Sequence, residues 1–133
     1  MSQENVEIVK KMTEVFNSEG SEAAGRRFFA EDVEFCDPPN SPSPRVARGR
    51  EEVREQFNAF NETWETHKSD PQEIRGVGED KVLLVSLERF TGRDGIELET
   101  PSASVFTLRD GKVIRWETFW QRQQALEAAG LSE

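Results

Sequence analysis

The second half of the sequence contains four β-rich stretches that are separated by short turn sequences. The stretches cover roughly residues 70–77, 81–91, 96–108 and 112–120. The turns between them are Gly78-Glu79-Asp80, Asp94-Gly95 and Asp110-Gly111. Asp-Gly between β-rich runs is a strong hairpin signal, and strands joined by tight turns pair antiparallel. This half of the chain therefore predicts an antiparallel meander.

The first half of the sequence has the periodicity of helices. Apolar residues recur every three to four positions over 6–16, and Gly20 is placed to end that helix. A shorter helix is expected over 21–29, and a third over 53–64 with one apolar stripe. A brief strand is expected at 33–36, and a short helix or turn after residue 120. Helices followed by strands indicate an α+β domain, a cone-shaped curved antiparallel sheet covered by N-terminal helices.

Composition sets the class of protein. The 133 residues include 17 basic and 26 acidic side chains, a net charge of −9, with enough large apolar residues to build a core. We therefore expect a single domain over 1–133. The acidic balance and the lack of a basic, aromatic-rich cluster argue against nucleic acid and membranes as partners. The polar N-terminus and the lack of an apolar run of about 20 residues predict a cytoplasmic protein.

Few motifs of known chemistry are present. The single cysteine, Cys36, excludes an intrachain disulfide and cannot form a thiolate cluster alone. With neither a phosphate-binding loop nor a metal-ligand cluster, the sequence predicts no cofactor and no metal site. His67, Ser69 and Asp70 lie within four residues, but catalytic triads assemble in space, so a solvated helix exit is the better interpretation.

The segment from Asp37 to Gly49 is a proline-rich loop that follows an apolar strand. Its prolines are Pro38, Pro39, Pro42 and Pro44. A 13-residue connection in a small domain is more often functional than accidental. Asp37 opens this loop, where its carboxylate can point into the mouth of the cone and act as a base. The alternative is that Asp-Pro simply initiates a turn.

The face pattern of the stretch 81–91 bears on quaternary structure. One face carries Val82, Leu84, Ser86, Glu88 and Phe90, and the other carries Leu83, Val85, Leu87 and Arg89. A sheet that is apolar on both faces needs a second cover, and a second copy of the chain is the simplest one. We therefore expect a homodimer through the sheet, the alternative being that the second row packs locally on loops or the C-terminal segment. The candidate interface positions are Leu83, Val85, Leu87, Ala103, Val105, Val113 and Phe119.

Five segments in this order resemble a known family. They are ENVEIVKKMTEVFN, DVEFCDPP, ARGREEVREQF, TLRDGKVIRWETFW and QALEAAGL. Together they are similar to the bacterial SnoaL-like proteins of the nuclear transport factor 2 superfamily, which also includes ketosteroid isomerases, polyketide cyclases and limonene epoxide hydrolases. The resemblance covers almost the whole chain. It implies a cone-shaped α+β fold with a deep apolar pocket, usually dimeric through the sheet.

The resemblance carries over to the chemistry only in part. Ketosteroid isomerases use an Asp base with an oxyanion hole of Tyr and a protonated Asp. Asp37 with the following proline matches the base, whereas the tyrosine falls on Met12 and the second Asp on or near Ser104. The epoxide hydrolase residues fall on Val82, Leu84 and Thr118, so that chemistry is absent. The acidic residue of the cyclases has no secure counterpart.

Three functions remain open from the sequence. The first is binding of a small, mainly apolar, carbonyl-containing molecule, with isomerase- or cyclase-type proton transfer by Asp37 and with Ser104 as oxyanion donor. The second is a non-catalytic binding module, and the third is an interaction domain whose cone is filled by side chains. The expected pocket lining is Met12, Phe16, Trp64, Leu84, Ser86, Phe106, Trp116, Thr118 and Trp120. Whether Glu88 turns inward to pair with Asp37 is undecided.

Overall fold

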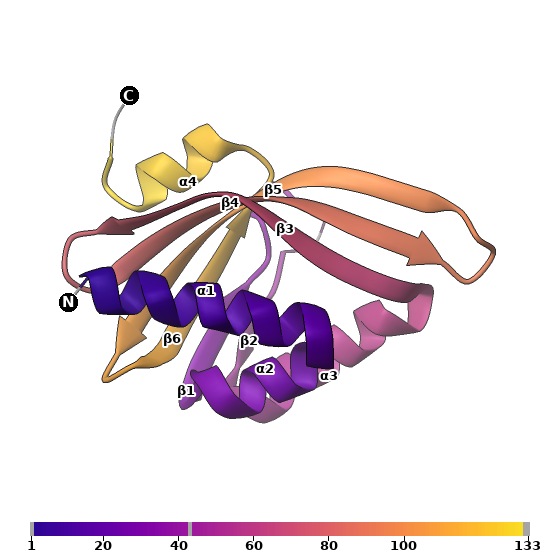
Figure 1. Cartoon of the computed structure of the whole chain (residues 1–133), viewed down its shortest axis with the longest axis horizontal. Helices are drawn as coiled ribbons and strands as arrows, with labels where there is room; N and C mark the ends of the chain where they lie inside the picture. Colours follow the sequence, from indigo (N-terminus) through magenta and orange to yellow (C-terminus); the bar gives the residue numbers. More distant parts are fainter. Residues whose placement is uncertain (1, 43, 132–133) are drawn as a thin grey trace.

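The computed structural model describes residues 2–42 and 44–131 and shows a curved, unclosed sheet with helices on both faces (Figure 1). The helices are α1 (Ser2–Glu19), α2 (Ser21–Phe28), α3 (Gly49–Thr63) and α4 (Arg122–Ala128). The strands are β1 (Phe29–Cys36), β2 (Val46–Arg48), β3 (Trp64–Val77), β4 (Lys81–Gly92), β5 (Glu97–Arg109) and β6 (Lys112–Phe119). The predicted α+β architecture is therefore confirmed.

The six strands follow the order β2-β1-β6-β5-β4-β3. Strands β3 to β6 form the predicted antiparallel meander, and their register pairs Leu84 with Ser104 and Ser104 with Thr118. Strand β1 joins the meander by pairing in parallel with β6. The turns match their sequences, since Gly78, Gly95 and Gly111 all have positive φ, which glycine adopts without a Cβ clash. The sheet therefore links the first strand of the chain directly to the last.

Several element boundaries differ from the sequence prediction, and the end of the predicted loop forms the short strand β2, which pairs with β1. Phe29 begins β1 and does not extend α2. Trp64 begins β3 and does not end the third helix, and β3 starts six positions earlier than expected. The polar sequence at 64–70 hid this strand, but it pairs with β4 along its whole length, so His67 lies opposite Phe90. Pairing with β4 therefore fixes residues 64–70 as a strand, although their local sequence pattern is ambiguous.

The core lies in two layers. The larger cluster packs α1, α2 and α3 onto the concave face of the sheet and includes the fully buried Val9, Val53 and Phe106. The smaller cluster lies between the opposite face and α4, which contributes Ala125 and Leu126. Helix α4 ends in the chain reversal at Gly130, where φ is positive. In the described part of the chain, no helix has both the length and the apolar character of a membrane span.

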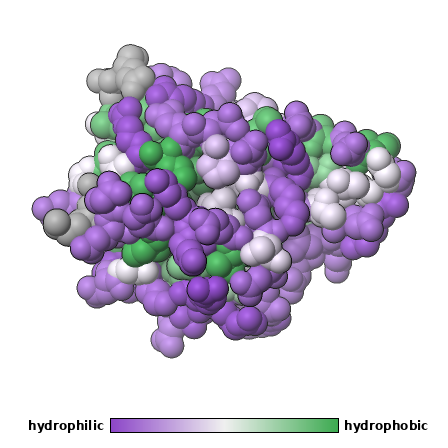
Figure 2. All heavy atoms as spheres, viewed as in Figure 1, coloured by the Kyte–Doolittle hydropathy of each residue, from purple (hydrophilic) through white to green (hydrophobic). Residues whose placement is uncertain are grey.

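Helix α4 changes the interpretation of the second apolar face. It packs within the same chain on Leu83, Ala103, Val105 and Phe119, which is the local cover that the sequence left as an alternative. Val113 belongs instead to the core on the helix side, because a register shift after Thr107 changes the face on which it lies. The homodimer stays a prediction. Figure 2 shows a largely hydrophilic surface, with hydrophobic atoms at the β4–β5 hairpin end, where Ile96 and Leu98 are exposed.

Candidate functional site

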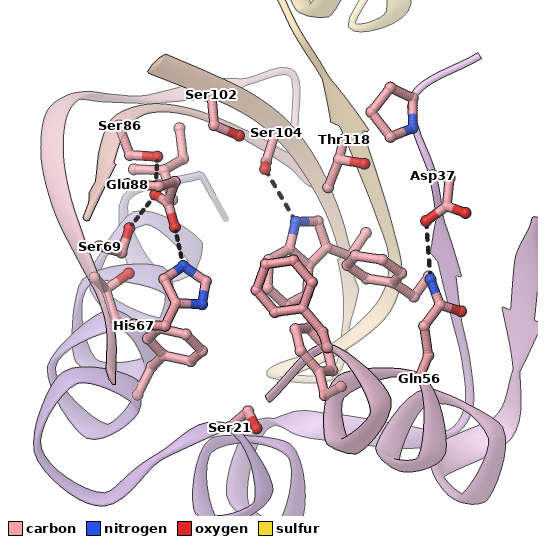
Figure 3. A pocket seen from close by; sticks show the side chains of 18 of the residues that line it. Ser21, Asp37, Gln56, His67, Ser69, Ser86, Glu88, Ser102, Ser104 and Thr118 are labelled. Atoms are coloured by element: carbon pink, nitrogen blue, oxygen red, sulfur yellow. Dashed lines mark hydrogen bonds and ion pairs between the residues drawn. The ribbon is translucent and has the colours of Figure 1, made fainter. Parts of the chain in front are cut away.

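A cavity of about 460 Å³ lies between the concave face of the sheet and helices α1 to α3. Its walls are mostly apolar, and polar side chains gather on two opposite sides of it (Figure 3). The residues named from the sequence that do line it are Met12, Phe16, Asp37, Leu84, Ser86, Ser104, Phe106, Trp116, Thr118 and Trp120. The cone is therefore open, which excludes the filled-cone alternative.

Trp64 is a correction to the predicted lining. As the first residue of β3 it pairs with Gly92, and its indole packs against the ring of Phe90 at 5.0 Å between centroids. It borders a separate surface depression together with Lys68 and Arg93. Its position in a strand, and not at the end of a helix stripe, turns it away from the cavity.

The aromatic wall of the cavity is centred on Trp116. Its indole lies 4.9 Å from the ring of Phe106, 5.0 Å from that of Phe35 and 5.5 Å from that of Phe57, measured between centroids. The indole N–H donates to the Ser104 hydroxyl oxygen at 3.0 Å. Edge and tilted ring contacts of this kind add to the stability gained by burial. The wall is therefore a fixed apolar surface, and the proton of the Ser104 hydroxyl is left to donate elsewhere.

Asp37 lies on one side of the cavity, directly after β1 (Figure 3). Its Oδ1 accepts a hydrogen bond from Gln56 Nε2 at 2.8 Å, and its Oδ2 accepts one from the backbone N–H of Arg45 at 3.1 Å. The Arg45 guanidinium is 3.9 Å from Oδ2. The side chain is 23% exposed. The carboxylate is therefore held in place by loop and helix while it borders the cavity.

His67 and Glu88 occupy the opposite side of the cavity (Figure 3). His67 Nε2 and Glu88 Oε1 are 2.7 Å apart, and each side chain is 15% exposed. The other carboxylate oxygen, Oε2, accepts hydrogen bonds from the hydroxyls of Ser69 at 2.7 Å and Ser86 at 2.5 Å. Glu88 thus turns inward, as the sequence left open, but it pairs with His67 and not with Asp37.

The His67–Glu88 pair corrects the expectation of a solvated helix exit. Residues 67 and 69 are two apart on a strand, so both side chains face the cavity, while Asp70 faces the other way and reaches Arg89 at 3.4 Å. In the structure, positions 67–69 alternate between half-buried and exposed, as in a strand with one face toward the core, but the local sequence carries no such signal. The His67–Glu88 contact could not be predicted, because it depends on the pairing of β3 with β4 and the two residues are far apart in the sequence.

Burial and hydrogen bonding oppose each other at Glu88. Burial raises the pKa of this carboxyl, but the hydrogen bonds from His67, Ser86 and Ser69 together outweigh burial, so the pKa lies below its ordinary value of 4.5. Because the folded pKa is lower than the unfolded one, the ionised carboxylate stabilises the fold above about pH 4.5. That contribution is lost as the pH falls through the folded pKa.

We therefore expect Glu88→Gln to flatten the acid limb of the stability profile. The free energy of unfolding, measured by urea denaturation from pH 6 to pH 3, should fall less steeply with acid in the variant than in the wild type. Glu97→Gln, at an exposed position on β5, is the matched control and should keep the wild-type slope. Equal slopes for the wild type and Glu88→Gln would contradict the hydrogen-bond pattern around Glu88.

The cavity offers no obvious metal site. Across residues 2–42 and 44–131, no three His, Cys, Asp or Glu side chains gather in a way that could hold a metal ion. The polar groups of the cavity are carboxylates, an imidazole and hydroxyls, and these suit hydrogen bonding and proton transfer. The site can therefore hold a mainly apolar molecule and exchange protons with it at two places.

The family model of the SnoaL-like domain matches residues 9–116. The chain belongs to the SnoaL-like family. No curated protein matches the sequence. Among solved structures, this SnoaL-like chain is similar to an NTF2-like protein of unknown function from Burkholderia pseudomallei, with a TM-score of 0.76, 15% identity, and 93% and 95% of the two chains covered.

Two further solved structures are of ligand-bound proteins. One is a hypothetical protein with a ketosteroid isomerase-like fold from Catenulispora acidiphila, in complex with trimethylamine, with a TM-score of 0.73, 17% identity, and 95% and 94% coverage. The other is TerC co-crystallised with polyporic acid, with a TM-score of 0.76, 18% identity, and 96% and 98% coverage. At these identities the likeness shows the shared fold.

Proposed function

We propose that this SnoaL-like protein binds a small, mainly apolar molecule with a carbonyl group, and that it catalyses isomerase- or cyclase-type proton transfer with Asp37 as the base. The observation that carries the proposal is a carboxylate held by two hydrogen bonds beside a cavity with aromatic walls. A carbon acid next to a carbonyl gives up its proton to such a base. Family membership and the presence of ligands in two similar structures support the binding of a small molecule.

The proposed reaction needs only groups that border the cavity. Asp37 takes the proton from the carbon next to the carbonyl, and the electron pair of that C–H bond moves to the carbonyl oxygen as an enolate. The Ser104 hydroxyl, whose oxygen accepts from Trp116, donates to this oxyanion. Return of the proton to a different carbon gives an isomer, whereas attack of the enolate carbon on a second carbonyl closes a ring, and the proton held by Asp37 then passes to the alkoxide oxygen that forms.

Two observations favour the alternative of a non-catalytic binding module. Both oxygens of Asp37 already accept hydrogen bonds. In addition, the position that matches the oxyanion-hole tyrosine of the ketosteroid isomerases holds a methionine, Met12. A binding module would keep affinity for apolar ketones without exchanging their protons.

Solvent deuterium incorporation into a panel of apolar ketones, read by mass spectrometry, tests the proposal without a known product. We expect exchange with the wild type and its loss in Ser102→Phe, because a ring at this cavity-lining position fills the ligand space. Ketone binding, followed by the fluorescence of the cavity tryptophans, is measured in parallel. Binding without exchange supports the binding module, and the absence of binding for every ketone contradicts both functions.

A further inference from the structure

The second ring nitrogen of His67 is a buried polar atom without a partner. Nδ1 is inaccessible to solvent, and no described residue forms a hydrogen bond with it. The imidazole stacks on Phe90 at 4.3 Å between centroids, meets Phe16 edge-on at 4.9 Å and lies 5.7 Å from Phe60. Buried polar side-chain atoms are nearly always paired, and an orphan calls for an explanation such as a ligand. His67 lines the cavity, so a ligand there can supply the partner once the rings packed around the imidazole shift enough to uncover Nδ1.

Glu88 determines which ring nitrogen of His67 carries the proton. Its Oε2 accepts from two serine hydroxyls, and its Oε1 faces His67 Nε2 at 2.7 Å. A carboxylate accepts hydrogen bonds only, so Nε2 must carry the proton in this pair. In the neutral ring Nδ1 is then the acceptor. This is the arrangement by which a carboxylate orients a histidine that acts as a base.

We propose that His67, oriented by Glu88, is a second polar subsite whose Nδ1 accepts a proton from a hydroxyl or enol group of the ligand. The natural ligand would then be an apolar molecule that carries a weakly acidic O–H in addition to its carbonyl. This inference deepens the proposed function and rests on it for the cavity, but it does not depend on Asp37.

The geometry of Figure 3 gives the ligand an orientation. Asp37 and His67 lie on opposite sides of the cavity, with the aromatic wall and Ser104 between them. An O–H at the His67 side and an enolisable carbon at the Asp37 side can therefore be engaged together. When the proton transfers, the O–H bond breaks, the electron pair stays on the ligand oxygen and a new N–H bond forms at Nδ1. The resulting imidazolium remains paired with the Glu88 carboxylate.

Nuclear magnetic resonance of the imidazole nitrogens tests this directly. His67 is the only histidine of the sequence, so the ¹⁵N signals of its ring need no assignment by mutation. We expect the neutral ring of the ligand-free protein to carry its proton at Nε2 and to leave Nδ1 unprotonated. Addition of 4-phenylphenol should move the Nδ1 signal towards that of a hydrogen-bonded or protonated nitrogen, and the isosteric 4-methylbiphenyl should leave it in place.

Affinity for the same two probes gives a second readout. An apolar wall alone favours the methyl compound, because the hydroxyl loses its water on entering. With Nδ1 as its acceptor, we expect 4-phenylphenol to bind the wild type at least about tenfold more tightly than 4-methylbiphenyl. His67→Phe keeps the ring contacts and should abolish this preference. Asp37→Asn should preserve it.

A second, nearly isosteric variant keeps the test valid if His67→Phe does not fold. Glu88→Gln can present either its amide oxygen or its amide N–H to Nε2, so the ring proton is no longer fixed at Nε2 and the preference for the phenol should fall. A ligand-free ring protonated at Nδ1, or a phenol preference that follows Asp37 and not His67, would overturn the proposal. Deuterium exchange at carbon tests Asp37 as the base, whereas the preference for the phenol tests His67. Either proposal can therefore be contradicted without the other.

Discussion

Replacing Asp37 by asparagine is expected to reduce deuterium exchange into bound ketones by about 10²- to 10⁴-fold, the range that a positioned general base contributes. The amide has the same shape and lacks the basic lone pairs of the carboxylate. Ketone affinity should change by only a few fold, since the cavity walls are untouched. Exchange is read by mass spectrometry and affinity by tryptophan fluorescence, so the chemical step and binding are separated.

Asp32→Asn is the matched control for this experiment. Asp32 lies on β1, the strand that Asp37 directly follows, but its side chain is 65% exposed, pairs with Arg109 and does not line the cavity. This variant should exchange ketone protons at the wild-type rate. Full exchange by Asp37→Asn would eliminate this carboxylate as the base, and a parallel loss in both variants would point to a general effect of charge.

The largest effect on stability is expected from Phe106→Ala. Phe106 is 1% exposed and packs on Trp116 in the main core, and removal of a buried phenylalanine ring costs about 3–5 kcal/mol of unfolding free energy. The ring also forms part of the cavity wall, so the space left by the alanine enlarges the ligand cavity. Urea denaturation followed by circular dichroism gives the change in unfolding free energy.

Phe60→Ala provides the comparison within the same cavity. Phe60 also lines the cavity, but it is 41% exposed at the rim, on α3, so its truncation should cost no more than about 1.5 kcal/mol. Similar losses for the two variants would mean that the aromatic wall is not the rigid centre of the core that its packing indicates.

The fold was predictable because its signals are local. The spacing of apolar residues in α1 and the glycines of the hairpin turns specify their elements without help from the rest of the chain. The face of Leu84, Ser86 and Phe90 that looks into the cavity follows from strand alternation alone. The position of Asp37 at the end of an apolar strand indicates a place at the cavity, although the Asp-Pro sequence fits a simple turn equally well.

The pair of His67 and Glu88 was not predictable in the same way. It joins two strands whose register is set by the hairpin between them, and a register shift between Pro71 and Glu73 intervenes. Counting alternation from the turn would not carry reliably through such an irregularity. The same cause moved Val113 to the other face of the sheet. The face on which a residue lies therefore could not be predicted beyond an irregularity in strand pairing.

The parallel pairing of β1 with β6 has a consequence for how the molecule assembles. Phe35 lies beside Trp116, so the aromatic wall joins residues about eighty positions apart. Contacts between such distant residues form slowly, because a long loop must close before they gain stability. During synthesis the meander and the N-terminal helices can begin to form separately. The cavity itself is complete only after the last strand has docked, which places its formation late in folding.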